Sequence, residues 1–270
     1  MISKNHIRII ILLSASISFA AMAHCAEEGR RNTPIVKVVK EWSPSVVNIS
    51  TEKMAMVQHP PFWGDYRSQL NDFFNQYARG GISAMKLKGL GSGVIVSGDG
   101  LIVTNAHVVS MASKVYVILS DGSSYEAELM AISQRDDLAL IKITPSRELR
   151  SVQFADDVMI GETVVSIGNP FGLENSVSSG IVSGVNRKIY STVSGEVVFD
   201  DLIQTDASIN LGSSGGALLN LDGKLVGINL AMIQSAQNLG FVIPGGKIKK
   251  ILKDYAEAVK TRKVIKIPVE

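Results

Sequence analysis

Short apolar runs separated by turn residues dominate the sequence between residues 45 and 245. Pairs such as Asp99-Gly100, Asp121-Gly122 and Asp222-Gly223 stand between the runs and are typical of tight turns. A first series of runs predicts strands at residues 45–49, 94–96, 101–104, 115–119, 125–132 and 138–143. A second series predicts strands at residues 163–167, 180–185, 197–204, 217–220, 225–229 and 239–243. The pattern indicates an all-β fold with two β lobes.

Apolar residues at helical spacing occur near the two ends of this region. Residues 35–40 predict a short helix, which Ser43-Pro44 would end before the first strand. Residues 247–260 predict a single terminal helix, because their apolar positions follow a helical period: Ile248, Ile251, Leu252, Tyr255 and Val259. We expect this apolar face to pack on the second lobe.

The regular pattern lapses between residues 53 and 88. Pro60-Pro61 and Gly80-Gly81 bracket a stretch rich in aromatic residues, from Phe62 to Tyr77, whose spacing suggests a turn or two of helix. Insertions of this length in a compact domain are usually functional or disordered. Three interpretations stay open: the aromatic residues pack locally, cover a neighbouring subunit, or gate a site.

Glycines alternate with other residues just before the first series, in the sequence Gly89-Leu90-Gly91-Ser92-Gly93. A phosphate-binding loop of this kind would lead into a helix, and no helix is predicted here. We therefore interpret the motif as a turn that enters a strand.

The first residues have the features of a secretory signal. Lys4 and Arg8 precede the apolar run 9–13, and small residues lead to Ala21-Met22-Ala23. The run is short for a membrane span and is followed by several serines, which disfavours the alternative of a retained anchor. We predict a signal peptide at residues 1–23, cleaved after Ala23, and export to the periplasm or beyond.

Removal of the signal would leave a nearly neutral protein. Lys4 and Arg8 leave with it, so Lys+Arg falls from 27 to 25 against 25 Asp+Glu. Nucleic-acid binding needs a basic surface that neutralises phosphates, so we expect no nucleic-acid partner.

Cysteine and histidine usage limits the chemistry further. The only cysteine is Cys25, at the signal boundary, so the domain has no disulfide framework. Lipid attachment at Cys25 is disfavoured by the bulk of His24 before it, although a peripheral membrane association stays open. Because His24, His59 and His107 do not cluster with a thiol, we predict no metal and no other cofactor.

Ser214 lies in the most informative stretch, Gly212-Ser213-Ser214-Gly215-Gly216, flanked by apolar runs. A serine hydroxyl is a poor nucleophile until an imidazole removes its proton, and the imidazole needs a carboxylate to orient it. The glycines permit a tight turn that exposes the hydroxyl. We predict Ser214 as a nucleophile and assign the oxyanion hole to Gly212, Ser213 and Ser214, chiefly to the backbone N–H groups of the first and last.

His107 and Asp137 are the candidate partners of this serine. His107 follows the predicted strand 101–104, where a lone histidine would more often be structural. Asp137 directly precedes an apolar strand, where a half-buried carboxylate could reach the imidazole. Asp136 is interpreted as a solvated turn residue. We predict His107 as general base and Asp137 as its orienting partner.

The order of these residues decides between two folds. The motif Gly-x-Ser-x-Gly also fits the nucleophile elbow of α/β-hydrolases, but that fold needs a histidine after the serine and none follows His107. The order histidine, aspartate, serine belongs to two six-stranded antiparallel β-barrels of the trypsin/chymotrypsin type. We expect the protease domain at 24–270, with a first barrel at about 35–145, a second at about 158–245 and the helix at about 246–262.

Several spaced motifs resemble the HtrA/Deg family of trypsin-like serine proteases, over roughly residues 35–255. They are Thr104-Asn105-Ala106-His107-Val108-Val109, Asp137-Leu138-Ala139-Leu140-Ile141, Gly168-Asn169-Pro170-Phe171-Gly172, Ser179-Gly180-Ile181-Val182-Ser183 and the stretch from Gln204 to Gly216. The resemblance implies the same roles for His107, Asp137 and Ser214. It also implies ATP-independent cleavage of unfolded or misfolded exported proteins in protein quality control and stress response, a homotrimer, and a preference for small aliphatic residues before the cut.

The chain departs from the family pattern in places. The family usually has asparagine at the position of Ser213 and often arginine at that of Leu211. Members generally continue into PDZ domains, and we expect none here because the sequence ends at Glu270. Two other functions stay open: a chaperone-like binding module with little or no proteolytic activity, and an esterase.

Overall fold

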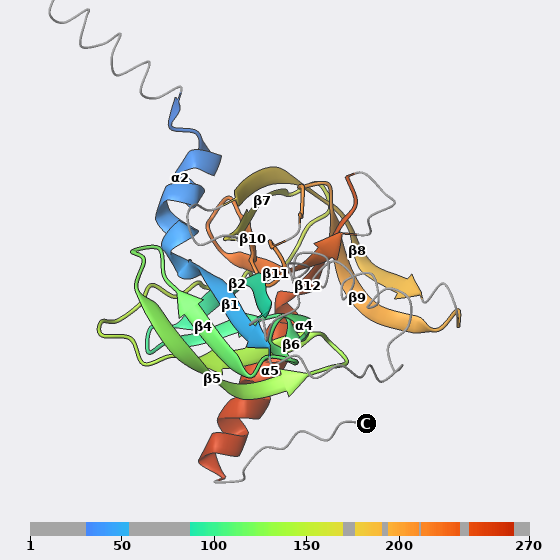
Figure 1. Ribbon diagram of the computed structural model, residues 1–270. Helices are drawn as coiled ribbons and strands as arrows, with labels where there is room; N and C mark the ends of the chain where they lie inside the picture. Colours follow the sequence, from blue (N-terminus) through green and yellow to red (C-terminus); the bar gives the residue numbers. More distant parts are fainter. Residues whose placement is uncertain are drawn as a thin grey trace, which may run out of the picture.

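Two closed β-barrels, each of six antiparallel strands, make up most of the described part of the computed structural model (Figure 1). The structure describes residues 31–53, 87–169, 176–190, 194–210, 212–232 and 238–261. The predicted signal peptide, Cys25 and residues 54–86 of the predicted insertion lie outside them. The architecture confirms the predicted all-β fold of two barrels.

The first barrel closes in the order β1-β2-β3-β6-β5-β4, because β4 pairs with β1. Its strands are β1 (Val46–Lys53), β2 (Leu87–Ser97), β3 (Leu101–Thr104), β4 (Lys114–Ile118), β5 (Ser124–Ser133) and β6 (Leu138–Lys142). The strands β1 and β2 extend into the two ends of the segment that was predicted to lack regular structure. A short helix, α4 (Ala106–Val109), follows β3.

The second barrel closes in the order β10-β11-β12-β9-β8-β7. Its strands are β7 (Thr163–Gly168), β8 (Ser176–Tyr190), β9 (Val197–Thr205), β10 (Ala217–Asn220), β11 (Leu225–Met232) and β12 (Gly240–Pro244). The segment between the barrels is tied to the second one by a parallel bridge between Phe154 and Leu225.

Strands at the junction of the barrels are buried on both faces. In β6, Ala139 and Ile141 pack inside the first barrel, whereas Leu138 and Leu140 belong to a core that residues of both barrels share. Because successive side chains point to opposite faces, a strand that buries both faces shows a continuous apolar run and not an alternating one. The shared core fixes how the two barrels sit against each other.

The N-terminal helix α2 (Pro34–Trp42) covers part of this junction. Its first turn is capped by Thr33, whose Oγ1 accepts a hydrogen bond from the Val36 N–H at 3.3 Å. The helix ends in a 3₁₀ turn (Ser43–Ser45) that contains the predicted proline break. Val38 enters the shared core, so the helix is anchored to both barrels.

The C-terminal helix α5 (Gly245–Lys260) differs from its prediction in where it packs. Ile248 and Ile251 are buried in the shared core, and the helix contacts β5 and β6 of the first barrel as well as β11 and β12 of the second (Figure 1). Val259 is 58% exposed, so the buried face ends before the last turn. The helix joins the two barrels instead of covering only the second.

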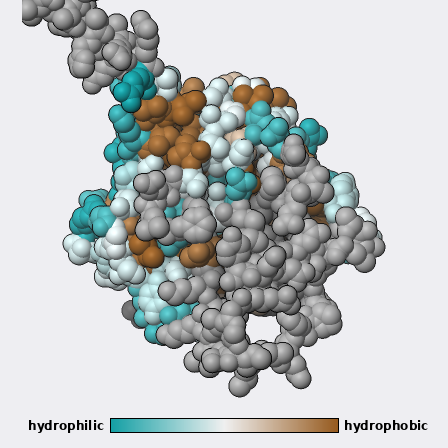
Figure 2. Space-filling view, turned by 45° about the horizontal axis from the view of Figure 1, so that its top comes forward, coloured by the Kyte–Doolittle hydropathy of each residue, from teal (hydrophilic) through white to brown (hydrophobic). Residues whose placement is uncertain are grey.

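The surface combines polar and apolar areas. On the face shown in Figure 2, apolar residues gather in separate patches among polar ones. Large exposed apolar side chains include Met159 and Ile160, which are 61% and 67% exposed. Among the described residues, no helix is both long and apolar enough to cross a membrane.

Candidate active site

His107 and Asp137 are joined by two hydrogen bonds. His107 lies in α4, just beyond the end of β3, and the buried Asp137 lies in the turn before β6. The Asp137 carboxylate accepts a hydrogen bond from the His107 backbone N–H at 2.9 Å and lies 2.6 Å from the ring Nδ1. Because a carboxylate can only accept, Nδ1 carries the proton of this bond and Nε2 is the acceptor nitrogen. The contact fixes the orientation and the tautomer of the imidazole.

The backbone of Asp137 is also tied to the histidine segment. Its carbonyl accepts hydrogen bonds from the Ala106 N–H and the Asn105 Nδ2, both at 3.1 Å. Its φ angle of 52° lies in the left-handed region, which aspartate tolerates better than most residues. These hydrogen bonds tie the turn before β6 to the start of α4.

Asp136 is not the solvated turn residue that was expected. Its Oδ1 lies 3.0 Å from the Lys247 Nζ of α5, and its Oδ2 accepts a hydrogen bond from the Ser133 hydroxyl. Lys247 also bonds to Asp200 of β9 at 2.8 Å. Burial disfavours the charged ammonium of Lys247, but its hydrogen bonds to both carboxylates outweigh this effect and raise its pKa. The same hydrogen bond from Lys247 lowers the pKa of Asp200.

Ser214 lies in a tight turn just before β10 and is buried. Its backbone carbonyl accepts a hydrogen bond from the Ser92 N–H at 2.9 Å. Gly215 follows with a φ angle of 83°, and a Cβ atom there would lie 2.1 Å from the Ser92 carbonyl oxygen, so only glycine fits. The Ser214 Oγ donates to the Leu230 carbonyl at 3.4 Å, which is long for a hydrogen bond between two oxygens.

The three amides assigned to the oxyanion hole differ in what they bind. The Ser213 N–H donates to the Asn210 carbonyl at 2.9 Å, so this amide is already used inside the turn. Among the described residues, nothing accepts a hydrogen bond from the N–H of Gly212 or of Ser214. The assignment therefore narrows to these two amides.

Strand β2 lies between the histidine segment and the serine turn. A Cβ atom at Gly91 would lie 2.7 Å from the Val108 side chain of α4, and the next residue, Ser92, donates to Ser214. Thr104, at the end of β3, donates its hydroxyl to the Ser92 carbonyl at 2.7 Å. Two successive residues of one strand thus contact both halves of the predicted site.

The glycine motif around Ser92 was interpreted wrongly. It lies inside β2 and is not a turn that enters the strand. A Cβ atom at Gly93 would lie 2.8 Å from Ile102 of the neighbouring strand, so the glycines permit close packing of α4 and β3 on β2. Sequence reasoning missed Ser92 for this reason, although a serine between two glycines beside an apolar run could have indicated a close approach.

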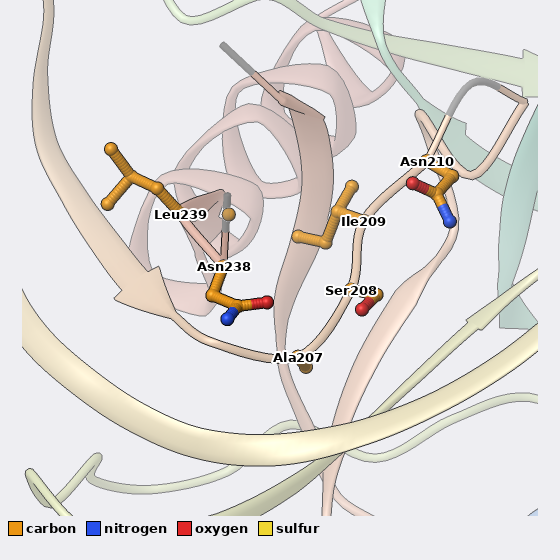
Figure 3. Close-up of a pocket in the computed structure, with 7 residues that line it drawn as sticks. Ala207, Ser208, Ile209, Asn210, Asn238 and Leu239 are labelled. Carbon is orange, nitrogen blue, oxygen red and sulfur yellow. The ribbon is translucent and has the colours of Figure 1, made fainter. Parts of the chain in front are cut away.

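A cavity of about 220 Å³ lies beside the serine turn. It is lined by Ala207, Ser208, Ile209, Asn210, Asn238, Leu239 and Gly240. Figure 3 shows the Ile209 side chain on the side of its own segment that faces Asn238 and Leu239. None of these described residues is charged, although Ser208, Asn210 and Asn238 have polar side chains.

Comparisons with known proteins indicate the family of the chain. Residues 91–228 match the family described as "Trypsin-like peptidase domain". The chain is 36% identical to the periplasmic serine endoprotease DegP of Escherichia coli strain K12 over 92% of its own length and 56% of DegP. It is 46% identical to the mouse serine protease HTRA4 over 62% of its own length and 34% of that protein.

A solved structure gives the same result. The HtrA-type protease AlgW with a tripeptide superimposes with a TM-score of 0.64 and 30% identity, over 83% of this chain and 64% of that one. The chain spans about half the length of DegP-type relatives. The chain therefore belongs to the family of trypsin-like peptidases, and its relatives within that family are HtrA and DegP proteases.

Proposed function

We propose that this protein is an exported serine endopeptidase that degrades unfolded or misfolded polypeptides without ATP. The observation that carries the proposal is the pair of hydrogen bonds from the Asp137 carboxylate to His107, which leaves Nε2 as the basic ring nitrogen. The buried Ser214 supports the proposal, because its turn is hydrogen-bonded to β2 and β2 also packs against the helix that carries His107.

Acylation uses these groups in sequence. As the Ser214 Oγ bonds to the carbonyl carbon of the substrate peptide, His107 Nε2 takes the hydroxyl proton. The carbonyl electrons move to oxygen, and the N–H groups of Gly212 and Ser214 donate to the resulting oxyanion. When the C–N bond breaks, the leaving amine takes the proton from Nε2 and an ester of Ser214 remains.

Deacylation repeats the steps with water as the nucleophile. Nε2 takes a proton from the water as its oxygen bonds to the ester carbon, and returns that proton to Oγ as the C–O bond to Ser214 breaks. Asp137 stabilises the imidazolium in both halves of the reaction and takes up no proton. The products are a carboxylic acid and the restored serine.

The cavity beside the serine turn supports a preference for small aliphatic residues before the cut. Ile209 lines this cavity, and its Cδ1 would lie 2.9 Å from a Cβ atom at Gly240 on the other side. A long side chain would meet this methyl group, and a charged one would lose its hydration without an opposite charge among the described lining residues. Substrates that are unfolded can present such residues, because their chain is extended and accessible.

Location and assembly are part of the proposal. Relatives are named periplasmic, which supports export of this chain to the periplasm. We expect that residues 1–23 are cleaved as a signal peptide. We expect homotrimers and polypeptide substrates, with a possible peripheral contact with the membrane and no nucleic-acid partner.

The central test is degradation of unfolded casein by the protein with and without Ser214→Ala. We expect the variant to lose activity by at least about 10³-fold, because the remaining groups cannot form the acyl-enzyme. A fluorophosphonate should label the wild type at Ser214. Ser213→Ala is the matched control, since it removes a neighbouring hydroxyl and keeps every backbone amide, and it should still be labelled.

Three outcomes separate the candidate functions. Equal casein cleavage by wild type and Ser214→Ala would refute the protease. Binding of casein without cleavage by the wild type would favour a chaperone-like module. Turnover of small esters with no peptide cleavage would favour an esterase.

A further inference from the structure

Ser92 of β2 makes two hydrogen bonds to the serine turn. It is fully buried in β2, and the residue paired with it in the neighbouring strand β1 is Asn48. Its backbone N–H donates to the Ser214 carbonyl at 2.9 Å, and its hydroxyl donates to the Gly212 carbonyl at 2.6 Å. One residue of the first barrel thus holds two carbonyls of a turn in the second.

The Ser92 hydroxyl both donates and accepts a hydrogen bond. While it donates to Gly212, it accepts a hydrogen bond from the Asn169 N–H at 2.8 Å, just after β7. Asn169 is itself held, because its carbonyl accepts from the Asn48 side chain at 2.8 Å. Hydrogen bonds in such a buried chain polarise and strengthen one another. These hydrogen bonds orient the Ser92 hydroxyl toward the Gly212 carbonyl.

These two contacts hold the peptide groups on either side of the Ser213–Ser214 bond. The Gly212 carbonyl belongs to the peptide before Ser213, and the Ser214 carbonyl belongs to the peptide after Ser214. When both point at β2, the peptide between them, which carries the Ser214 N–H, has little freedom to rotate. That N–H is one of the two amides that donate to no group among the described residues.

We propose that Ser92 is a positioning residue that preorganises the Ser214 N–H, one of the two proposed oxyanion donors, through its hydroxyl. The inference rests on the proposed function, since it assigns a role within the same site. Fixed donors stabilise developing charge without reorganising during the reaction, so loosening them lowers the rate and leaves substrate binding in the ground state intact.

The test is Ser92→Ala, which removes the hydroxyl and keeps the backbone N–H. Ser113→Ala is the matched control, because it also removes a hydroxyl that donates to a backbone carbonyl, that of Glu52 at 2.9 Å, on the exposed surface. With a small peptide substrate, we expect kcat of Ser92→Ala to fall roughly tenfold with KM within about twofold. The control should match the wild type.

A peptide boronic acid supplies a readout that a general loss of stability would not give. Its tetrahedral adduct places an oxygen where the oxyanion forms, so its affinity should fall in parallel with kcat, while an unreactive peptide of the same sequence binds as before. Ser92→Thr, which keeps a hydroxyl, should recover part of the loss. Unchanged kcat and boronate affinity in Ser92→Ala would overturn the inference, as would equal losses for both peptides.

Amide hydrogen exchange in the segment 212–216 does not depend on activity. We expect it to accelerate at least severalfold in Ser92→Ala and to stay unchanged in Ser113→Ala. If the wild type is inactive but this acceleration occurs, the proposed function fails and the positioning role of Ser92 stands. Unchanged exchange would contradict that role even in an active enzyme.

Discussion

Ile209 illustrates how one side chain sets a property of the site. It is 1% exposed and lines the cavity beside the serine turn (Figure 3). Its Cδ1 would lie 2.9 Å from a Cβ atom at Gly240, the first residue of β12. Asn210, the next residue, holds the Ser213 N–H through its carbonyl. The residue that limits the cavity is thus connected directly to the turn that carries the predicted nucleophile.

Shortening Ile209 should broaden the specificity. In Ile209→Ala, the larger cavity should raise kcat/KM for substrates with leucine before the cut, relative to valine, by about tenfold, because each methylene in such a pocket is worth about 1–3 kcal/mol. Paired fluorogenic peptides measure the ratio. Ile160→Ala, at a position 67% exposed, should leave it unchanged. An unaltered ratio in Ile209→Ala would place the specificity pocket elsewhere.

Helix α5 acts as an element that connects the barrels. Lys247, in its first turn, bonds to Asp136 beside the predicted site in the first barrel and to Asp200 in the second. Its side chain is only 17% exposed, so these contacts are stronger than most surface ion pairs. The short turn between β5 and β6 is therefore held by α5 on one side and by α4 on the other.

Lys247→Met should destabilise the fold. It leaves a partly buried carboxylate at Asp136 without its cation, and we expect the free energy of unfolding to fall by about 1–3 kcal/mol in urea titrations at pH 7. Lys253→Met is the control on the same helix, because Lys253 is exposed and lies 3.8 Å from Glu257, and it should change stability by under about 0.5 kcal/mol. Equal stability of Lys247→Met and wild type would exclude the connecting role.

The stability lost in Lys247→Met should depend on pH, and the direction follows from the two pKa shifts. Because the folded pKa of Asp200 is lowered, its contribution is complete above its ordinary value near 3.8 and is lost as the pH falls through the folded pKa. The raised pKa of Lys247 gives a contribution that is complete below its ordinary value near 10.5 and is lost as the pH rises through the folded pKa. The difference in unfolding free energy between the wild type and Lys247→Met should be largest between these two pH limits.

At the scale of the whole molecule, a core shared by the two barrels fixes how they sit against each other. Val46 and Leu138 of the first barrel and Val165 and Leu219 of the second belong to one buried cluster. Exposed apolar residues such as Met159 and Ile160 remain outside it. Their exposure is compatible with burial in an assembly, as the proposed homotrimer requires.

Sedimentation equilibrium tests the proposed assembly directly. The mature protein should sediment with three times the mass of one chain at micromolar concentration, because association would bury apolar surface that one chain leaves exposed. Ser214→Ala should behave identically, since its hydroxyl lies buried inside the fold. A species with the mass of a single chain over the whole concentration range would contradict the trimer.

The strands and their order in two series could be predicted from the sequence because apolar runs and turn residues are local signals. The choice of His107, Asp137 and Ser214 also followed from the sequence, since acyl transfer needs those residue types in one of a few chain orders. Their catalytic roles remain predictions. The structure adds the contact between His107 and Asp137, which no local pattern encodes.

What tertiary structure alone decided lies where segments distant in the sequence touch. Asp136 was taken for a solvated residue because its partner, Lys247, is on the last helix, and Ser92 was overlooked because its partners, Gly212 and Ser214, are in the other barrel. The sequence by itself determined which residues can form strands and which can do chemistry, because these depend on side-chain type and near neighbours. The burial, charge environment and fixed direction of each group come from packing between the barrels, which only the folded chain defines.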